Sequence, residues 1–194
     1  MSPPVAGLIL AAGASRRMGR AKALLTYGNE TFIGRLQRIL AEHCSPVAIV
    51  LGHQAELIGP MLDRRILTAV NPDPERGMLS SLQTGLKALG EPGRVLFLPL
   101  DYPAIDPSTV ALLCAAPPCL IAMPRFEGRR GHPVLISRTV IEELLALPHG
   151  AAARDVIRSH DADIHYVEVT DPAILVDVDT PADYEALVNG SSRL

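Results

Sequence analysis

Short apolar runs alternate with longer amphipathic stretches along the first half of the chain. The apolar runs are hydrophobic throughout, which is typical of parallel strands that are covered on both faces of a sheet. The pattern predicts strands at 5–10, 47–51, 66–70 and 95–100, separated by helices at 31–43, 54–62, 78–89 and 107–115. We therefore expect an α/β protein with three layers, in which helices cover an open, mostly parallel sheet on both sides.

The second half of the chain shows the same alternation less regularly. Further strands are expected at 120–123, 134–136, 164–169 and 173–178, with helices at 140–147 and 152–160. A glycine-rich segment at 127–131 interrupts this half, and we expect the sheet to become mixed there. The last helix begins at Pro181, with Thr180 as its N-cap and Asp183 completing a capping-box arrangement. No linker or repeat divides the sequence, so a single domain over 1–194 is the simplest prediction.

Composition excludes several classes of protein. The chain has 194 residues, of which 48% are hydrophobic, and this suits one sizeable core. A net charge of −3 argues against a nucleic-acid-binding surface. No apolar run approaches the roughly 18 residues of a membrane span, and the first residues lack the features of a signal peptide. We expect a cytoplasmic protein that makes no contact with nucleic acid or membrane.

The cysteines and histidines do not form a recognisable metal motif. Cys44, Cys114 and Cys119 show no C-x-x-C spacing and lie in or beside apolar stretches, so we expect buried, reduced thiols. The six histidines have no zinc-binding spacing either. Any metal is expected to be held by carboxylates.

The loop after the first strand concentrates glycine and positive charge. Residues 10–22 read Leu-Ala-Ala-Gly-Ala-Ser-Arg-Arg-Met-Gly-Arg-Ala-Lys. Glycines let the backbone approach an anion closely, and the four cations would neutralise it, so the loop fits a phosphate site. It matches neither a Walker loop nor the G-x-G-x-x-G dinucleotide motif. The alternative is an ordinary strand end with a solvated basic surface.

The pattern L-A-A-G-x-S-x-R-M-G-x-x-K in this loop resembles the signature of the MobA-like nucleotidyltransferases, which include the molybdenum cofactor cytidylyl- and guanylyltransferases. The resemblance extends from Gly7 to Leu187 and implies a Rossmann-like nucleotidyltransferase fold. It also implies transfer of a nucleotidyl group from a nucleoside triphosphate, with release of pyrophosphate. Lys22 would contact the α-phosphate and Arg17 the β- and γ-phosphates. The implied nucleotide-binding residues are Leu10, Ala11, Ala12, Gly13, Ser15, Arg16, Gly19, Asn71, Gly77 and Ser81.

Two details of the resemblance concern the nucleotide. Ala12 stands where the guanylyltransferase branch generally has glycine, so the similarity favours CTP. The segment 71–86 resembles the family's N…G-M-x-x-S-L-x-x-G-L element, in which Gly77 allows close approach to a ligand and a helix N-terminus carrying Ser81 offers donors. The leucines of the same segment are spaced for packing against the core, and both interpretations can hold together.

Carboxylates follow two other expected strands. Asp101, in a D-x-P element, resembles the family's metal-binding aspartate, although such a residue also commonly opens a turn. The same similarity implies Asp177 as the second ligand of Mg²⁺ and Asp179 as a turn or cap residue. Two carboxylates beside a phosphate site suit Mg²⁺, which keeps waters and phosphate oxygens as further ligands.

The acceptor is predicted from the segment 128–134, which resembles the family's G-x-x-G-[NH]-P-V element. Arg130, Gly131 and His132 would receive a phosphorylated acceptor such as molybdopterin, and the alternative is a basic hairpin turn. His53 is not expected to be catalytic. The segment 149–154 departs from the family's G-D-x-G-A-R pattern, because it keeps the final Ala-Arg but lacks the acidic residue.

This departure keeps two alternatives open. One is a nucleotidyltransferase for a sugar phosphate or another phosphorylated alcohol. The other is a non-catalytic carrier that delivers molybdenum cofactor to a client molybdoenzyme. The charged set of Lys22, Asp101 and Asp177 favours the enzyme, because a carrier has no need for groups that stabilise a transferring phosphoryl group.

Overall fold

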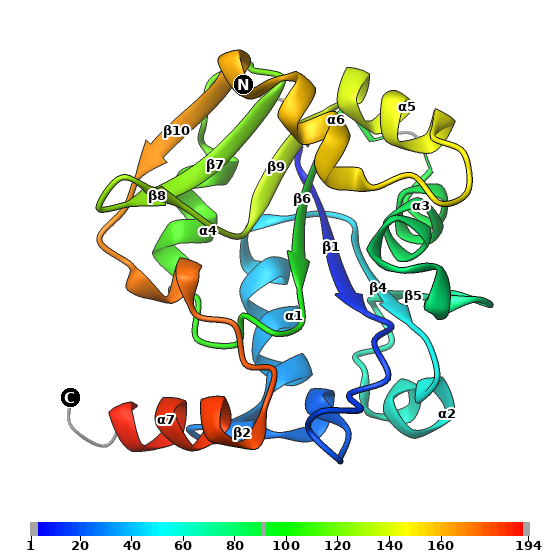
Figure 1. The fold of residues 1–194 in the computed structure, drawn as a ribbon, viewed down its shortest axis with the longest axis vertical. Helices are drawn as coiled ribbons and strands as arrows, with labels where there is room; N and C mark the ends of the chain where they lie inside the picture. The colour runs from blue at the N-terminus through cyan, green and yellow to red at the C-terminus, as the bar shows by residue number, and fades with distance from the viewer. Residues whose placement is uncertain (1–3, 91, 192–194) are drawn as a thin grey trace.

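The computed structural model describes residues 4–90 and 92–191 and shows a twisted central sheet with helices on both faces (Figure 1). The strand order is β10-β7-β9-β6-β1-β4-β5, and β8 pairs with β7. The strands are β1 (Ala6–Ala11), β4 (Val47–Leu51), β5 (Leu67–Val70), β6 (Arg94–Pro99), β7 (Ile121–Phe126), β8 (Arg129–Arg130), β9 (Val134–Ser137) and β10 (Ile164–Glu168). The α/β prediction is therefore confirmed.

The central strands are parallel and buried, as continuous hydrophobicity predicts. β1 pairs in parallel with both β4 and β6, so that Leu8 lies opposite Ala48 on one side and Phe97 on the other. β9 runs antiparallel to β6 and β7, which confirms that the sheet is mixed. The edge strand β5 is largely exposed.

Helices cover the two faces of the sheet with separate apolar clusters. α1 (Phe32–His43) and α4 (Pro107–Cys114) pack on one face, and α3 (Met78–Ala88), α5 (Arg138–Ala146) and α6 (Ala153–Ser159) pack on the other. Two further helices are α2 (Ala55–Ile58) and α7 (Pro181–Ser191). In the part of the chain that the structure covers, no helix combines the length and apolar character needed to cross a membrane.

Side-chain caps explain where two helices begin. Thr31 Oγ1 accepts a hydrogen bond from the Gly34 amide at 3.1 Å and starts α1. At α7, Asp183 Oδ2 accepts from the Thr180 amide at 2.7 Å, and the Asp183 amide donates to Thr180 Oγ1 at 3.3 Å. This reciprocal arrangement confirms the predicted capping box.

The prediction of a strand at 173–178 is wrong. A 3₁₀ turn, Pro172–Leu175, takes its place. Asp171 Oδ1 accepts the Ala173 amide at 3.0 Å, and Pro172 has the fixed backbone angle that suits the first position of such a turn. The Ile174 carbonyl accepts the His132 amide at 3.1 Å, outside any strand ladder. An apolar run here reflects packing against the core and not strand pairing.

Smaller differences concern short elements. The helix predicted at 54–62 divides into α2 and a 3₁₀ turn, Gly59–Met61, at Pro60. A two-stranded ribbon of β2 (Thr26–Tyr27) and β3 (Glu30–Thr31) was too short to be signalled by periodicity. The three cysteines are free thiols, of which Cys44 is buried while Cys114 and Cys119 are half-buried.

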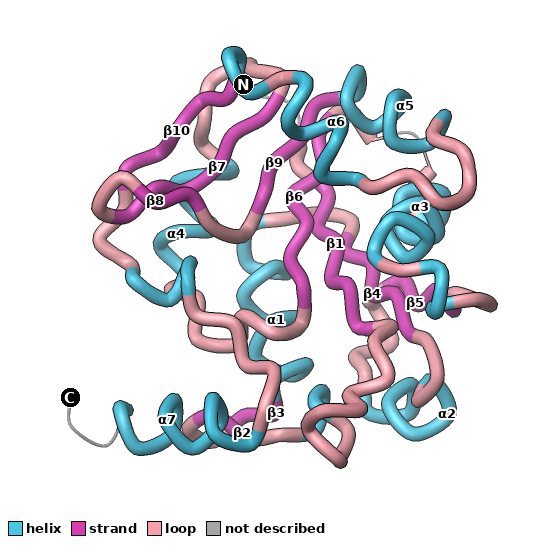
Figure 2. Tube along the Cα trace, viewed as in Figure 1, coloured by secondary structure: helices cyan, strands magenta, loops and turns pink. Residues whose placement is uncertain are grey.

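The arrangement of strands determines where the site lies. β1, β4 and β6 are parallel, so their carboxyl ends meet at one edge of the sheet. Figure 2 shows that the loops after β1 and β6 gather at this edge, close to the segment that enters α7. The Leu100 amide donates to the Leu10 carbonyl at 3.0 Å and fixes the two strand ends side by side.

Candidate active site

A cleft lies at the carboxyl ends of β1 and β6. It consists of an inner cavity of about 260 Å³ and an outer cavity of about 340 Å³. The two share a wall made of Ala12, Gly13, Ser15, Lys22, Pro74 and Asp101. The inner cavity adds Leu10, Ala11, Gly77, Met78, Ser81, Pro99 and Leu100, and the outer one adds Ala14, Arg16, Arg17, His53, Glu75 and Asp179. Most of the residues predicted to bind a nucleotide therefore line this cleft; Gly19 and Asn71 do not.

The loop after β1 is held in shape from within. Ser15 has a left-handed backbone (φ +52°), as does Gly19 (φ +71°), and the Ser15 carbonyl accepts the amides of Met18 and Gly19 at 3.1 Å. Ser15 Oγ accepts the Lys22 amide at 3.2 Å. Met18 is buried and anchors the loop to the core. The glycine at 19 thus serves the turn, without lining the cavity.

Gly13 has a different role. A Cβ added there would meet no atom within 4 Å, so the missing side chain leaves free space at the wall of the cleft. Packing does not require a glycine at this position, and Gly13 borders both cavities. Its missing side chain would therefore allow a ligand to approach the backbone closely.

Two cations of this loop converge on one carboxylate. Lys22 Nζ lies 2.7 Å from Asp179 Oδ1, and Arg17 Nη2 lies 2.7 Å from Asp179 Oδ2. The Lys22 side chain is only 12% exposed, whereas Arg17 extends into solvent. The hydrogen bond from Lys22 is the main cause that lowers the pKa of Asp179. Asp179 is therefore part of the charged site, and it also takes part in the cap of α7 as expected, because its amide donates to Asp183 Oδ2 at 3.1 Å.

Asp101 is the least satisfied polar group of the cleft. Its Oδ1 is buried and has no hydrogen-bond partner among the described residues. Burial raises the pKa of Asp101; the nearby charge of Lys22 opposes this shift, and Asp179 and Asp177 add to it. A buried carboxylate oxygen without a donor is costly unless a cation or another donor meets it. The Asp101 carboxylate thus fits a metal ligand.

The other expected ligand, Asp177, lies outside the two cavities. Its side chain is exposed, it does not line either cavity, and within the described chain it makes no hydrogen bond or ion pair. Its segment is tied to the site because the Val178 amide donates to the Asp101 carbonyl at 2.8 Å. No group of three or more His, Cys, Asp or Glu residues suited to a metal occurs in the described ranges. A divalent cation here would need water or substrate oxygens as further ligands, which suits Mg²⁺.

Asn71 acts within the protein. It is buried, its Nδ2 donates to Ser80 Oγ at 2.8 Å and to Ser81 Oγ at 3.0 Å, and its Oδ1 accepts the Asp73 amide at 3.0 Å. These bonds hold the loop before α3 against the start of that helix. Gly77, with φ +86°, lets this loop turn into α3. The structure therefore gives Asn71 a supporting position behind the cleft.

A third cavity of about 580 Å³ adjoins the cleft and is lined by two of the three residues predicted to bind the acceptor. Arg130 and His132 line it together with apolar residues from the sheet and α6. Gly131 packs so tightly that an added Cβ would lie 2.1 Å from the Ile174 carbonyl oxygen. Arg130 is engaged by Asp161 and Tyr166. The glycine thus fixes the segment, and the side chains on either side of it reach the cavity.

His132 is a neutral residue at physiological pH. Burial lowers the pKa of its imidazole to about 4, and the charge of Asp177 only partly opposes this shift. The ring lies against Tyr102, with centroids 4.6 Å apart. His132 can therefore offer a hydrogen bond to an acceptor, but it brings no positive charge to the acceptor's phosphate.

Glu75 is a feature of the cleft that sequence reasoning missed. Its Oε1 lies 2.6 Å from Arg16 Nη2 and 2.9 Å from His53 Nε2, so it joins the loops that follow β1, β4 and β5. The residue sits in the 71–77 segment, but nothing in its spacing indicates a partner in the first loop. Only the fold brings these three side chains together.

The mixed sheet and the charged loop at its carboxyl edge define a Rossmann-like α/β protein with a charged cleft at the ends of its parallel strands. The MobA-like NTP transferase domain matches residues 7–164, which is most of the chain. The chain therefore belongs to the MobA-like NTP transferase family, and the resemblance inferred from the first loop is confirmed.

Curated relatives cover nearly the whole chain. A nicotine blue oxidoreductase from Paenarthrobacter nicotinovorans is 32% identical over 92% of this chain and 93% of that protein. A molybdenum cofactor cytidylyltransferase from Escherichia coli (strain K12) is 26% identical, over 91% and 92% of the two chains. A molybdenum cofactor guanylyltransferase from Xanthomonas euvesicatoria pv. vesicatoria is 27% identical, over 96% and 95%.

Solved structures share the fold. A mycobacterial protein from Mycobacterium sp. strain JC1 superposes with a TM-score of 0.84 at 28% identity, covering 97% of each chain. A Mycobacterium tuberculosis protein in complex with manganese gives a TM-score of 0.74 at 25% identity, covering 96% of this chain and 98% of that one.

The buried His132 predicts a pH-dependent stability. A base whose pKa falls from about 6.5 when unfolded to about 4 when folded stabilises the protein fully above pH 6.5. This contribution is lost as the pH falls from 6.5 towards 4. The His132→Asn variant should lack this contribution. Between pH 7 and pH 5, the free energy of unfolding of the parent should therefore fall by about 1–2 kcal/mol more than that of the variant. Urea denaturation at the two pH values measures it, and parallel pH curves for parent and variant would contradict it.

The unpartnered Asp101 predicts a gain in stability on neutralisation. With EDTA present, Asp101→Asn should raise the free energy of unfolding by about 1 kcal/mol, because a buried charged oxygen without a donor is replaced by a neutral amide. Asp163→Asn, an exposed change of the same chemistry, is the matched control and should have little effect. Equal or lower stability of the Asp101 variant, measured by urea denaturation, would show that the carboxylate is already satisfied.

Proposed function

We propose that this protein transfers CMP from CTP to a phosphorylated acceptor, with molybdopterin as the acceptor and pyrophosphate as the second product. The observation that carries the proposal is the pairing of a glycine-lined phosphate loop with a buried, unpartnered Asp101 oxygen in one cleft. The family match supports nucleotidyl transfer. The names of the E. coli and X. euvesicatoria relatives support a molybdenum cofactor substrate.

The chemistry requires charge stabilisation more than covalent help from the protein. An oxygen of the acceptor phosphate attacks the α-phosphorus, a new P–O bond forms, and the bond to the β-phosphate oxygen breaks so that pyrophosphate leaves with the electron pair. A phosphate monoester is already an anion near pH 7, so no general base is needed. What the protein must supply is positive charge beside the α-phosphate and the leaving group.

The residues of the cleft fit these requirements. Lys22 is nearly buried beside Asp101, which suits a contact with the α-phosphate, where negative charge grows during transfer. Arg17 is more exposed and suits the β- and γ-phosphates, together with amides of the 13–19 loop. Both cations are paired with Asp179 before a ligand arrives, so phosphate oxygens would replace that carboxylate as their partner.

The carboxylates fit a magnesium site. Asp101 and Asp177 are the ligands we propose, since Asp179 is already engaged by two cations while Asp177 has no partner in the described chain. Mg²⁺ held there would neutralise charge on the phosphates during transfer. The manganese complex of the mycobacterial relative supports a divalent metal in this family.

The choice of nucleobase in the proposed substrate rests on the first loop. Ala12 lines the cleft at the position where the guanylyltransferase branch generally has glycine, which favours CTP over GTP. The relatives named above include enzymes for both nucleotides and one oxidoreductase, so ancestry alone does not decide the reaction. The phosphate-binding character of the cleft is what favours nucleotidyl transfer over a redox reaction.

The test is pyrophosphate release from CTP, GTP, ATP and UTP with Mg²⁺, measured with and without molybdopterin. We expect release that is selective for CTP and requires the acceptor. Release selective for GTP would overturn the assignment of CTP as the nucleotide. Release only with a sugar phosphate would overturn the assignment of molybdopterin as the acceptor. No release from any nucleotide would overturn nucleotidyl transfer and favour a carrier or the redox chemistry named for one relative.

Replacing Lys22 tests the catalytic assignment. Lys22→Met should lower kcat by about 100-fold or more, because one preorganised charge beside the transferring phosphoryl group is lost. Nucleotide affinity should fall by a smaller factor, since Arg17 and the backbone amides remain. Lys87→Met removes the same charge from an exposed position on α3 and is the matched control. An unchanged kcat in the Lys22 variant would exclude it from the reaction.

A further inference from the structure

The third cavity has an unusual distribution of charge. Its walls include the apolar residues Phe97, Met123, Val134 and Ile157, and its volume of about 580 Å³ is the largest of the three cavities described above. Every charged side chain that lines it is an arginine: Arg76, Arg130, Arg154 and Arg158. The neutral His132 also lines the cavity. Among the described residues, no Asp or Glu contributes to its wall.

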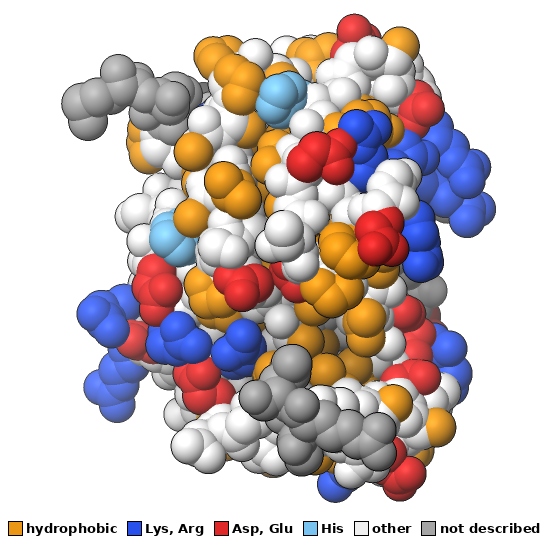
Figure 3. Space-filling view, turned by 90° about the vertical axis from the view of Figure 1, so that its left-hand side faces the viewer, with side chains coloured by type: hydrophobic (Ala, Val, Ile, Leu, Met, Phe, Trp, Pro, Cys, Tyr) orange, Lys and Arg blue, Asp and Glu red, His pale blue; other side chains and the backbone are white. Residues whose placement is uncertain are grey.

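Most of these arginines have no counter-ion. Arg130 is paired with Asp161, whereas the side chains of Arg76, Arg154 and Arg158 make no hydrogen bond or ion pair within the described parts of the chain. Arg154 and Arg158 lie four residues apart on α6, where like charges on one helix face repel each other. An anion between them would relieve this repulsion. Figure 3 shows Lys and Arg side chains at two margins of the molecule, in the upper right and the lower left of the view, with Asp and Glu side chains between them.

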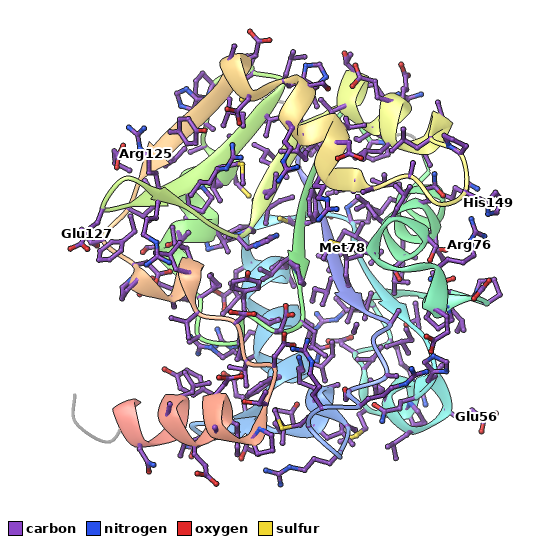
Figure 4. The ribbon with its side chains drawn as sticks, in the orientation of Figure 1. Glu56, Arg76, Met78, Arg125, Glu127 and His149 are labelled. Carbon is purple, nitrogen blue, oxygen red and sulfur yellow. The ribbon has the colours of Figure 1, made fainter. Side chains whose placement is uncertain are left out.

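The cavity opens to the proposed transfer site. It shares Gly77 and Met78 with the inner cavity of the cleft, and the Met78 residue at this junction is 52% exposed. Figure 4 shows Met78 at the centre of the molecule beneath α6, with Arg76 on the loop before α3. A molecule lying in the third cavity can therefore extend one end into the cleft.

The two anion-binding regions are separate. Lys22, Arg17 and Asp101 line the cleft and do not line the third cavity, whereas Arg154 and Arg158 line only the third cavity. The acceptor phosphate that attacks must lie in the cleft. A negative charge bound by Arg154 and Arg158 would then belong to a second group on the acceptor.

We infer that the acceptor has a ring system that fills the third cavity and a second anionic group that Arg154 and Arg158 bind. This inference rests on the proposed function and adds two specificity-determining residues that the resemblance of the 128–134 segment did not indicate. It also gives a meaning to the 149–154 segment, which lacks an acidic residue and supplies Ala151, Ala152 and Ala153 to the cavity wall. Small side chains make room for the ring, and loss of the carboxylate leaves the arginines free.

Two naphthalene dyes test the cavity without any enzymatic reaction. The sulfonated dye 1-anilinonaphthalene-8-sulfonate and the uncharged N-phenyl-1-naphthylamine share the ring system and differ in the anion. The double variant Arg154→Gln/Arg158→Gln should bind the sulfonate about tenfold more weakly, through loss of charge-assisted hydrogen bonds, and the uncharged dye unchanged. Ala152→Trp should weaken both dyes because it fills the cavity. Fluorescence titration measures all four affinities.

The control variant Arg64→Gln/Lys87→Gln removes two exposed positive charges that line none of the three cavities. It should leave the affinity for both dyes within about twofold of the parent, because screened surface charges act weakly at a distance. Equal losses of sulfonate affinity in the two double variants would overturn the inference, as would equal losses of both dyes in the arginine variant. Unchanged binding in Ala152→Trp would place the dyes elsewhere and also overturn it.

Kinetics separate this inference from the proposed function. With molybdopterin and CTP, Arg154→Gln/Arg158→Gln should raise the KM for the acceptor about tenfold and leave kcat within about threefold of the parent. The reason is that the lost contact stabilises the bound acceptor equally in the ground state and in the transition state. If no nucleotide is turned over but the dye results hold, the proposed function fails and the cavity assignment stands. If turnover is normal and the acceptor KM does not change, only the role of the two arginines fails.

Discussion

The carboxylate of Asp179 links the two ends of the chain at the site. It holds Lys22 and Arg17 at 2.7 Å each, and 157 residues separate it from the lysine. The Val178 amide, bonded to the Asp101 carbonyl, brings this carboxylate to the end of β6. Without these contacts the first loop would carry positive charge with no fixed orientation. The same contacts order the cations before a ligand arrives, which lowers the cost of orienting them on binding.

The site combines negative and positive groups in a way that a ligand-free protein does not need. Asp101 is half-buried near the charge of Lys22, its buried Oδ1 has no donor among the described residues, and Asp177 and Asp179 make its ionisation harder. Such an arrangement is unfavourable for stability, and the proposed binding of a cation together with phosphate oxygens would offset this cost.

Much of the fold could be predicted from the sequence, because strands buried on both faces have continuous apolar runs. The site could be predicted only in part. Gly13 and Lys22 belong to one short motif, whereas Glu75 and Asp179 act through partners in distant loops that only the tertiary structure brings near. The 173–178 run misled the prediction because an apolar segment can pack against a core without joining a sheet.

The histidine at 132 shows why residue type alone does not define a role. A histidine shortly after two arginines suggests a basic surface, but burial, including packing against Tyr102, keeps it neutral. Positive charge in the third cavity then comes from the arginines alone, and their side chains line its wall around an apolar interior. The cleft concentrates charge of both signs, while the third cavity separates charge from apolar surface. Two cavities of such different character suit two substrates of different chemistry, one a polyphosphate and the other a ring that also carries an anion.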